Sequence, residues 1–156
     1  MSKQKKKICY IASTGGHFEQ LMRLKPLMEK YPGFVVTEKT SYQPPTEDEK
    51  LYFIRQVNRK EKLFPLILLW NSVLSLRILI KERPDVTITT GALSVIPLCL
   101  LTKLFGKKLI YIESFARITS PNLTGKLLYK YADQFYVQWE SMLEVYPNAI
   151  YLGGIY

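Results

Sequence analysis

The stretch K-I-C-Y-I-A-S-T-G-G-H-F-E-Q-L, residues 7 to 21, gives the main indication of the fold. A short apolar run, Ile8 to Ala12, stops at a loop from Ser13 to His17, and apolar residues then recur at helical spacing as far as Tyr31. A strand, a glycine-containing loop and a helix in this order form the first unit of an open α/β sheet. In such a sheet the loop lies beyond the carboxyl end of the strand, where backbone N–H groups at the start of a helix can bind an anion.

Composition limits the number of domains and the kind of partner. The chain has 156 residues, of which 47% are hydrophobic, and this is enough for one domain with a core, over residues 1–156. Its 22 Lys and Arg against 13 Asp and Glu give a formal charge of +9, which favours nucleic acid, phospholipid or a phosphorylated substrate as partner. Cys9 and Cys99 lie inside apolar runs, which predicts reduced core thiols, no disulfide framework and no metal site. Residues 1–7 are a basic tail without the apolar region of a signal peptide, so we expect a cytoplasmic protein.

Short β-rich runs alternate with longer apolar or amphipathic runs, which is typical of an α/β protein. The Val-, Ile- and Tyr-rich strands read as buried on both faces, so we expect a parallel, doubly wound, Rossmann-like sheet. The segment Glu38 to Lys50, with two prolines and a charged T-E-D-E-K run, is predicted to be a loop. The expected strands are Ile8 to Ala12, Phe34 to Thr37, Tyr52 to Ile54, Val86 to Thr90, Lys108 to Ile112, Gln134 to Val137 and Ile150 to Leu152. The expected helices are His17 to Tyr31, Pro65 to Lys81, Leu93 to Phe105, Leu123 to Tyr131 and Ser141 to Tyr146.

The loop after the first strand has the composition of a ligand-binding turn. The adjacent Gly15 and Gly16 let the backbone approach a ligand closely, and the hydroxyls of Ser13 and Thr14 can cap the helix or bind phosphate oxygens. His17 is the only histidine of the chain, and a turn that merely joins a strand to a helix gains nothing from it. A plain structural turn is the alternative. Neither G-x-G-x-x-G nor the G-K-[ST] of a P-loop occurs in the sequence, so a nicotinamide cofactor and nucleotide hydrolysis lose support.

Two further loops are expected at the same edge of the sheet. Thr90, Gly91 and Ser94 follow the fourth expected strand and again combine glycine with small hydroxyl side chains. Glu113 follows the fifth expected strand, and Arg117 comes four residues later. The carboxylate of Glu113 is a candidate general base or ligand for sugar hydroxyls, and the alternative is an ion pair with Arg117 that fixes the loop.

Four motifs, in this order, resemble the acceptor-binding half of MurG-type glycosyltransferases. They are S-T-G-G-H after the first strand, T-G-A-L-S-V-I-P after the fourth, I-Y-I-E-S-F-A-R after the fifth and Y-A-D-Q-F-Y-V after the next helix. In particular the chain resembles the one-domain PssD/CpsF/EpsE-like bacterial polysaccharide proteins, which are akin to the membrane-anchoring subunit of the eukaryotic UDP-GlcNAc transferase that acts second on dolichol. The resemblance covers residues 8–154. Ala92 and Leu93 depart from it, because MurG-like chains often keep a more glycine-rich loop there.

The resemblance implies a GT-B glycosyltransferase divided between two polypeptides, in which this chain is the N-terminal, acceptor-side domain and a separate subunit binds the donor. The implied reaction is inverting transfer of a sugar from a nucleotide sugar, such as a UDP-sugar, to a polyprenyl-diphosphate-linked saccharide in bacterial capsule or exopolysaccharide synthesis, without metal or cofactor. His17 and Glu113 would face the acceptor hydroxyl as candidate bases. The residues expected to bind the acceptor and its diphosphate are Ser13, Thr14, Gly15, Gly16, Thr90, Gly91, Ser94, Ser114 and Arg117.

The C-terminal residues form an apolar tail, at the place where a single-chain relative would cross into its donor domain. We expect this tail to dock the partner subunit, and a terminal strand that completes the sheet is the other interpretation. In either case the chain alone is not expected to be a complete enzyme. The tail consists of Leu152, Gly153, Gly154, Ile155 and Tyr156.

Residues 63–80 are apolar almost all round a helix and follow a basic segment. Their number is close to the ~20 residues of a transmembrane span, but the proline, asparagine and arginine within them argue against a clean crossing. Two interpretations stay open, namely a crossover helix buried against the sheet and an interfacial helix. For the interfacial helix we expect Phe64, Leu68 and Trp70 to contact the cytoplasmic face of the cell membrane, with the chain peripheral or monotopic.

Three other functions stay open. A nucleic-acid-binding module would explain the charge but predicts a basic stripe interleaved with aromatic residues, whereas the lysines are scattered. A stand-alone flavodoxin-like enzyme for a small molecule would use the same first loop and complete its site within one domain. A non-catalytic membrane anchor or activator of the partner would need neither His17 nor Glu113.

Overall fold

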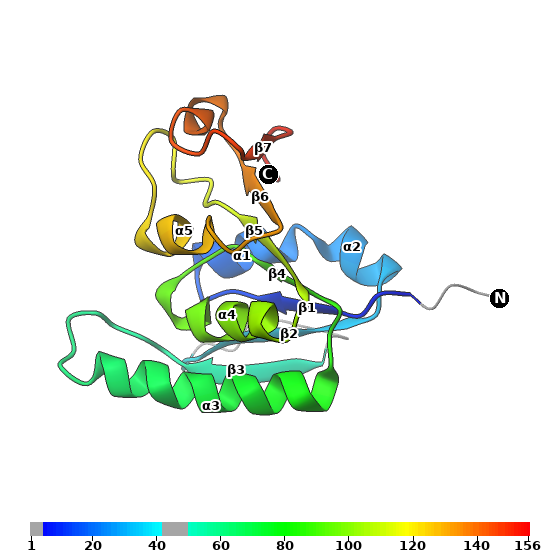
Figure 1. Ribbon diagram of the computed structural model, residues 1–156, viewed down its shortest axis with the longest axis vertical. Helices are drawn as coiled ribbons and strands as arrows, with labels where there is room; N and C mark the ends of the chain where they lie inside the picture. Colours follow the sequence, from blue (N-terminus) through cyan, green and yellow to red (C-terminus); the bar gives the residue numbers. More distant parts are fainter. Residues whose placement is uncertain (1–4, 42–49) are drawn as a thin grey trace.

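The computed structural model describes residues 5–41 and 50–156 (Figure 1). At its centre is a seven-stranded sheet in the order β3-β2-β1-β4-β5-β6-β7, with every neighbouring pair parallel. The predicted parallel, doubly wound α/β sheet is confirmed. The strands are β1 (Ile8–Ile11), β2 (Gly33–Lys39), β3 (Leu51–Arg55), β4 (Val86–Thr89), β5 (Lys108–Ile112), β6 (Gln134–Val137) and β7 (Ile150–Tyr151). The helices are α1 (Gly16–Met22), α2 (Lys25–Lys30), α3 (Phe64–Glu82), α4 (Ile96–Leu104) and α5 (Leu123–Leu128), with the 3₁₀ turns η1 (Leu93–Val95) and η2 (Glu140–Leu143).

Side chains of the central strands enter two separate cores on the two faces of the sheet. Cys9 and Ile11 of β1 pack in the core under α3, α4 and α5, whereas Ile8 and Tyr10 pack under α1 and α2. This alternation along one strand is the reason why the strands are apolar throughout. Both cysteines are buried and free, as the sequence predicts.

Two expected helices are interrupted in the structure. The helix expected over residues 17–31 is the pair α1 and α2, because Pro26 lacks the N–H that would continue α1 and instead lies in the first turn of α2. The helix expected over residues 93–105 begins as η1, and Pro97 lies in the first turn of α4. The last two expected helices are shorter than predicted, since α5 ends at Leu128 and η2 is a single 3₁₀ turn.

The ends of the strands differ from the expectation by up to two residues. β2 continues through Glu38 and Lys39, which were expected in a loop, because β3 pairs with it as far as Arg55. β7 ends at Tyr151, so Leu152 is not part of the sheet. The two prolines of the expected loop lie outside the described residues.

The crossover helix α3 exposes most of its apolar side chains and buries three polar ones, which is unusual for a helix of a soluble protein. Its buried side chains are Asn71, Ser75 and Glu82 together with Ile78 and Leu79. Its solvent-facing side carries Arg77, Lys81 and an apolar face, which consists of Leu66, Leu69, Trp70, Val73, Leu76 and Ile80, with Leu63 directly before the helix. Among the described residues, α3 is also the one helix that is long and apolar enough to cross a membrane. It lies along β3 and beside α4 (Figure 1).

Asn71 and Glu82 have partners at the edge of the sheet, whereas the buried hydroxyl of Ser75 has no hydrogen-bond partner among the described residues. Asn71 donates from Nδ2 to the carbonyl of Arg55 at 2.8 Å and accepts the Arg55 N–H at 2.9 Å. Arg55 ends the edge strand β3, so Asn71 satisfies backbone groups at the open side of the sheet. Glu82 accepts from two lysines, one of them Lys50 at 2.5 Å, and from the hydroxyl of Tyr52. Burial alone would raise the pKa of Glu82, but these hydrogen bonds outweigh it and lower the pKa to about 2.

Candidate functional site

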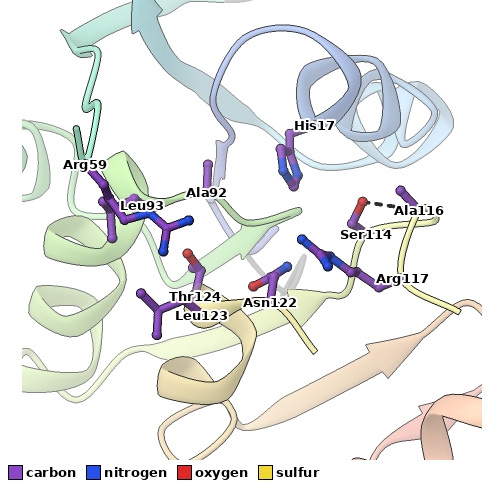
Figure 2. A pocket seen from close by; sticks show the side chains of 10 residues that line it. All are labelled: His17, Arg59, Ala92, Leu93, Ser114, Ala116, Arg117, Asn122, Leu123 and Thr124. Atoms are coloured by element: carbon purple, nitrogen blue, oxygen red, sulfur yellow. Dashed lines mark hydrogen bonds between the residues drawn. The ribbon is translucent and has the colours of Figure 1, made fainter. Parts of the chain in front are cut away.

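A cavity of about 320 Å³ lies at the carboxyl edge of the sheet, beside the point between β1 and β4 where the strand order reverses (Figure 2). Ligands of open parallel sheets bind at such a point. The loops after β1, β4 and β5 each contribute to the lining, as expected from the sequence. The lining residues are His17, Arg59, Ala92, Leu93, Ser114, Ala116, Arg117, Asn122, Leu123 and Thr124.

The imidazole of His17 projects into this cavity with a defined tautomer (Figure 2). Its Nδ1 lies 2.8 Å from the carbonyl oxygen of Thr90. A carbonyl only accepts, so Nδ1 carries the proton and Nε2 of the neutral ring keeps a lone pair. Burial lowers the pKa of His17, and the positive charge of Arg117 acts in the same direction. The ring is therefore neutral at pH 7 and able to accept a proton at Nε2.

Two arginines give the cavity a positive potential. The guanidinium groups of Arg59 and Arg117 enter it from opposite walls and point toward each other (Figure 2). Neither is a member of an ion pair formed by the described residues. No carboxylate of a described residue lines the cavity, and no group of three or more His, Cys, Asp or Glu among these residues could hold a metal ion. The cavity is therefore suited to an anion.

Glu113 does not face this cavity, and the expectation that it does is wrong. Its side chain is fully buried and its Oε1 accepts from the N–H of Ser114 at 2.9 Å and from the amide of Asn122 at 2.5 Å. Its Oε2 accepts from the hydroxyl of Tyr146 at 3.2 Å. The alternative ion pair with Arg117 is not among the ion pairs of the described residues either. Burial raises the pKa of Glu113, against the opposing effect of these hydrogen bonds.

Asn122 connects the buried carboxylate to the wall of the cavity. It is the N-cap of α5, and its Oδ1 accepts from the N–H of Gly125 at 2.6 Å while its Nδ2 donates to Glu113. Gly125 is needed for this close packing, because a Cβ there would lie 2.7 Å from the hydroxyl of Tyr146 and closer still to the carboxylate of Glu113. Glu113 thus positions the start of α5, which in turn positions Asn122 and Thr124 at the cavity.

Of the predicted residues in the first loop, only His17 lines the cavity. Gly15 and Gly16 are exposed, and the space that a Cβ would occupy at either glycine is open. Ser13 is buried, with its hydroxyl directed to the carbonyl of Thr14, and the Thr14 hydroxyl donates to Glu38 at 3.4 Å. These four residues lie next to the cavity in sequence but do not form its wall.

The second loop supports the histidine rather than lining the cavity with hydroxyls. Thr90 is buried and bonds to His17, and Ser94 is buried with no hydrogen-bond partner for its hydroxyl among the described residues. Gly91 has a φ of 99°, and a Cβ there would lie 2.7 Å from the hydroxyl of Tyr111. Ala92 has a φ of 103°, a conformation that favours glycine, so the departure from the glycine-rich pattern leaves this residue strained.

In the third loop, Ser114 and Arg117, which the resemblance implies bind the acceptor and its diphosphate, line the cavity. Sequence reasoning missed Arg59, Asn122 and Thr124. Asn122 had a readable signal, because an asparagine directly before an apolar helix is a typical N-cap. Arg59 follows β3, whose carboxyl end lies at the same edge of the sheet. Ligands bind beyond the carboxyl ends of parallel strands, so the loop after β3 could have been included with the other three.

The C-terminal tail lies against the outer side of the third loop. The N–H of Ile155 donates to Gln138 at 3.0 Å, and Gln138 donates to the carbonyl of Glu113 at 2.9 Å. The ring of Tyr156 lies 5.0 Å from that of Phe115. Leu152 is 81% exposed, so the tail after β7 combines an anchored end with a free apolar residue.

The residues expected to contact a membrane differ in their exposure. Trp70 is exposed, and the guanidinium of Arg55 lies 5.4 Å from its ring centroid. Phe64 and Leu68 are half-buried. The most exposed side chains of the apolar face of α3 are instead Leu66 and Leu69.

The model of the protein family described as "Oligosaccharide biosynthesis protein Alg14 like" matches residues 34–155, most of the chain. The chain belongs to this Alg14-like family. A similar relative, the UDP-N-acetylglucosamine transferase subunit ALG14 of Homo sapiens, is 28% identical over 95% of the Alg14-like chain and 82% of its own length. The corresponding subunit of Yarrowia lipolytica is 27% identical over 94% of this chain and 80% of its own length. That of Schizosaccharomyces pombe is 41% identical over a shorter region, 45% of this chain and 36% of its own length.

Solved structures confirm the predicted fold of the Alg14-like chain. MurG of Acinetobacter baumannii has a TM-score of 0.68 at 17% identity, over 87% of this chain and 42% of MurG. The complex of MnaA with UDP from S. aureus has a TM-score of 0.73 at 13% identity, over 96% of this chain and 44% of MnaA. The chain thus spans less than half the length of these proteins and has the fold of one Rossmann-like half of a GT-B structure.

Proposed function

We propose that this chain is the acceptor-binding, membrane-associated subunit of a two-polypeptide inverting glycosyltransferase. The proposed substrates are a nucleotide sugar and a polyprenyl-diphosphate-linked saccharide, and UDP-GlcNAc is the first donor to test because the relatives are named for it. The observation that carries the proposal is the cavity in which neutral His17 and the guanidinium groups of Arg59 and Arg117 face one space.

The reaction requires a proton acceptor on the acceptor side. The saccharide hydroxyl attacks the anomeric carbon of the donor sugar opposite the bond to the nucleoside diphosphate, and that bond breaks with inversion. The hydroxyl proton passes to Nε2 of His17, and the resulting imidazolium still donates from Nδ1 to the carbonyl of Thr90. General base catalysis of this kind contributes about 10²–10⁴-fold. We assign no proton transfer to Glu113, which is buried away from the cavity.

The donor would be held by a separate subunit. The relatives are named as subunits, and the chain matches less than half of its structural neighbours. We propose that the partner docks on the C-terminal tail, because Leu152 offers an exposed apolar side chain while Ile155 and Tyr156 are held against the third loop of the site. Docking there would place the donor beside the cavity.

The exposed apolar face of α3 supports a position on a membrane. An interfacial helix lies in the plane of the membrane with its apolar side buried, and basic residues nearby add about 1 kcal/mol each on anionic lipid. The apolar face of α3 and the preceding basic loop, with Arg59, Lys60 and Lys62, match this description. The proposed setting is the cytoplasmic face of a bacterial cell membrane in capsule or exopolysaccharide synthesis, on the resemblance of the four sequence motifs.

A transferase assay tests the proposal. Membranes that carry lipid-linked saccharide are incubated with a panel of labelled nucleotide sugars and with this chain, a candidate donor-binding subunit, or both. Activity should require both chains. His17→Asn keeps a donor for the Thr90 carbonyl but offers no base, so it should lower kcat by about 10²–10⁴-fold at unchanged Tm. Full activity of the second chain alone would refute the proposal, and full activity of His17→Asn would leave this chain as a non-catalytic anchor.

A further inference from the structure

A second cavity adjoins the first along the loop between β3 and α3. It has a volume of about 670 Å³ and is lined by Leu93 and by residues 56–61 of that loop. Arg59 and Leu93 line both cavities, so the two spaces meet at these side chains. The loop continues through Leu63, which is 62% exposed, into the apolar face of α3. The two cavities therefore lead from His17 past Arg59 to the loop that precedes α3.

We infer that Arg59 and Arg117 together hold the diphosphate of the lipid-linked acceptor, with the saccharide toward His17 and the hydrocarbon chain leaving over Leu93 toward α3. The inference rests on the proposed function. Beyond the proposed function, it assigns Arg59 to the binding of the head group and gives the direction in which the lipid leaves the site.

The charges of the two arginines favour a ligand with more than one negative charge. The guanidinium groups point toward each other (Figure 2), and no side chain among the described residues forms an ion pair with either. Two cations that share a partly desolvated space repel each other, and an anion between them offsets this repulsion. A guanidinium fork binds two phosphate oxygens at once, so a pair of forks matches a diphosphate better than a single phosphate. The carboxylate in the adjoining cavity is that of Glu61, which lies there with Arg59 and Lys60.

The surroundings of the two cavities give the ligand a direction. Asn122, Thr124 and His17 line only the first cavity and offer the polar groups that saccharide hydroxyls need. Leu93 lies where the two cavities meet, and the apolar face of α3 lies beyond the loop. A hydrocarbon chain gains about 25 cal/mol for each Å² that it removes from water. The chain therefore leaves toward α3, on the side that we assign to the membrane.

Titration of soluble probes into the full-length chain tests the role of Arg59 without partner or donor. Calorimetry measures the affinity for inorganic diphosphate and inorganic phosphate, and the NMR shifts of the His17 ring report whether the probe enters the first cavity. Diphosphate should bind more tightly than phosphate. Arg59→Ala should weaken diphosphate binding about tenfold or more, the loss expected for hydrogen bonds between charged groups, and Arg59→Lys should weaken it less.

The matched control is Lys62→Ala, which removes the same charge from the same loop at a residue that lines neither cavity. It should change the affinity by less than about twofold, as expected for an exposed charge. Equal losses in Arg59→Ala and Lys62→Ala would overturn the assignment of Arg59, as would a preference for phosphate over diphosphate.

Farnesyl diphosphate tests the direction of the lipid. It should bind more tightly than inorganic diphosphate, and Leu93→Ser should remove that gain while leaving the binding of inorganic diphosphate unchanged, which also shows that the variant is folded. Equal affinities for the two probes, or a gain that persists in Leu93→Ser, would overturn the proposed path.

Probe binding with no transferase activity counts against the proposed function alone, whereas transferase activity without an effect of Arg59→Ala counts against this inference alone.

Discussion

His17 and Thr90 are joined by two hydrogen bonds of opposite direction: the imidazole Nδ1–H donates to the Thr90 carbonyl at 2.8 Å, and the Thr90 hydroxyl donates to the His17 carbonyl at 2.6 Å. The pair connects the loops after β1 and β4, across the point where the strand order reverses. Because the bond from Nδ1 must break before the ring can turn, and the bond from the Thr90 hydroxyl holds the two backbone segments together, the orientation of Nε2 is set before a substrate arrives, which favours proton transfer.

The pH dependence of the reconstituted transferase should follow this histidine. Burial lowers the pKa of His17 below the usual 6.5, so kcat/KM should fall as the imidazole gains a proton, with the midpoint of the acid limb below pH 6.5. Measurement of kcat/KM against pH checks this, and in His17→Asn the residual activity should lack the acid limb. An acid limb centred above pH 6.5 would contradict the assignment of His17 as the base.

The lowered pKa of His17 should also make the stability of the chain by itself depend on pH. The unfolded chain binds a proton to His17 near pH 6.5, and the folded protein binds it only at lower pH. The contribution to stability is therefore fully present above pH 6.5 and is lost as the pH falls through the folded pKa. Urea unfolding between pH 5 and 7 measures this loss, and His17→Asn should remove it.

Glu113→Gln should leave the fold and most of the transferase activity intact. The amide oxygen can accept from Ser114 and Asn122, and the amide nitrogen can donate to the hydroxyl of Tyr146. Because the raised pKa of Glu113 means that the folded state binds its proton more tightly, wild-type stability declines as the pH rises above about 4.5 through the folded pKa. The variant should lack this decline in denaturant unfolding.

Glu113→Ala should lose about 3 kcal/mol or more in the free energy of unfolding, because buried donors lose their acceptor. A loss of activity in Glu113→Gln as large as that in His17→Asn would restore Glu113 as a candidate base.

Gly125→Ala should destabilise the protein although alanine is the better helix former by about 1 kcal/mol. The new Cβ would lie 2.7 Å from the hydroxyl of Tyr146 and even closer to the carboxylate of Glu113, and both groups are buried. We expect a loss of about 1–3 kcal/mol in the free energy of unfolding, measured in urea. Gly16→Ala is the control, since no atom lies within 4 Å of its Cβ position, and it should be close to neutral.

Two exposed leucines should separate membrane binding from partner binding. Leu69→Glu places a charge in the apolar face of α3 and should reduce flotation with anionic vesicles, whereas Leu152→Glu should not. Leu152→Glu should weaken capture of the donor-binding subunit, whereas Leu69→Glu should not. Equal vesicle binding by wild type and Leu69→Glu would show that α3 does not contact the lipid.

The sheet and the location of the site could be predicted from the sequence because they depend on local patterns. Strands buried on both faces are apolar throughout, and the loops that follow β1, β4 and β5 must meet at one edge of a parallel sheet. The position of Glu113 could not be predicted in this way. A carboxylate after a strand can point to the cavity or to the interior, and here the interior is open to it only because Gly125 on another element leaves room.

The orientation of α3 was beyond prediction for a related reason. Asn71, Ser75 and Glu82 share one side of the helix, and the usual expectation sends a polar side to water. The partners of Asn71 and Glu82 turn this side inward: the backbone of Arg55 donates to Asn71 and accepts from it, and the hydroxyl of Tyr52 donates to Glu82. These contacts join residues far apart in the chain, and no local pattern contains them.

The pairing of Asn71 with Arg55 also determines the rotation of α3 about its own axis. Successive residues of an α-helix are about 100° apart around that axis, so pairing through a neighbouring residue would turn a different row of side chains outward. The buried amide, together with Glu82 and its donors, thus sets which side chains the molecule shows to its surroundings. Substitutions at Asn71 could alter the surface chemistry of the protein while every surface residue stays the same.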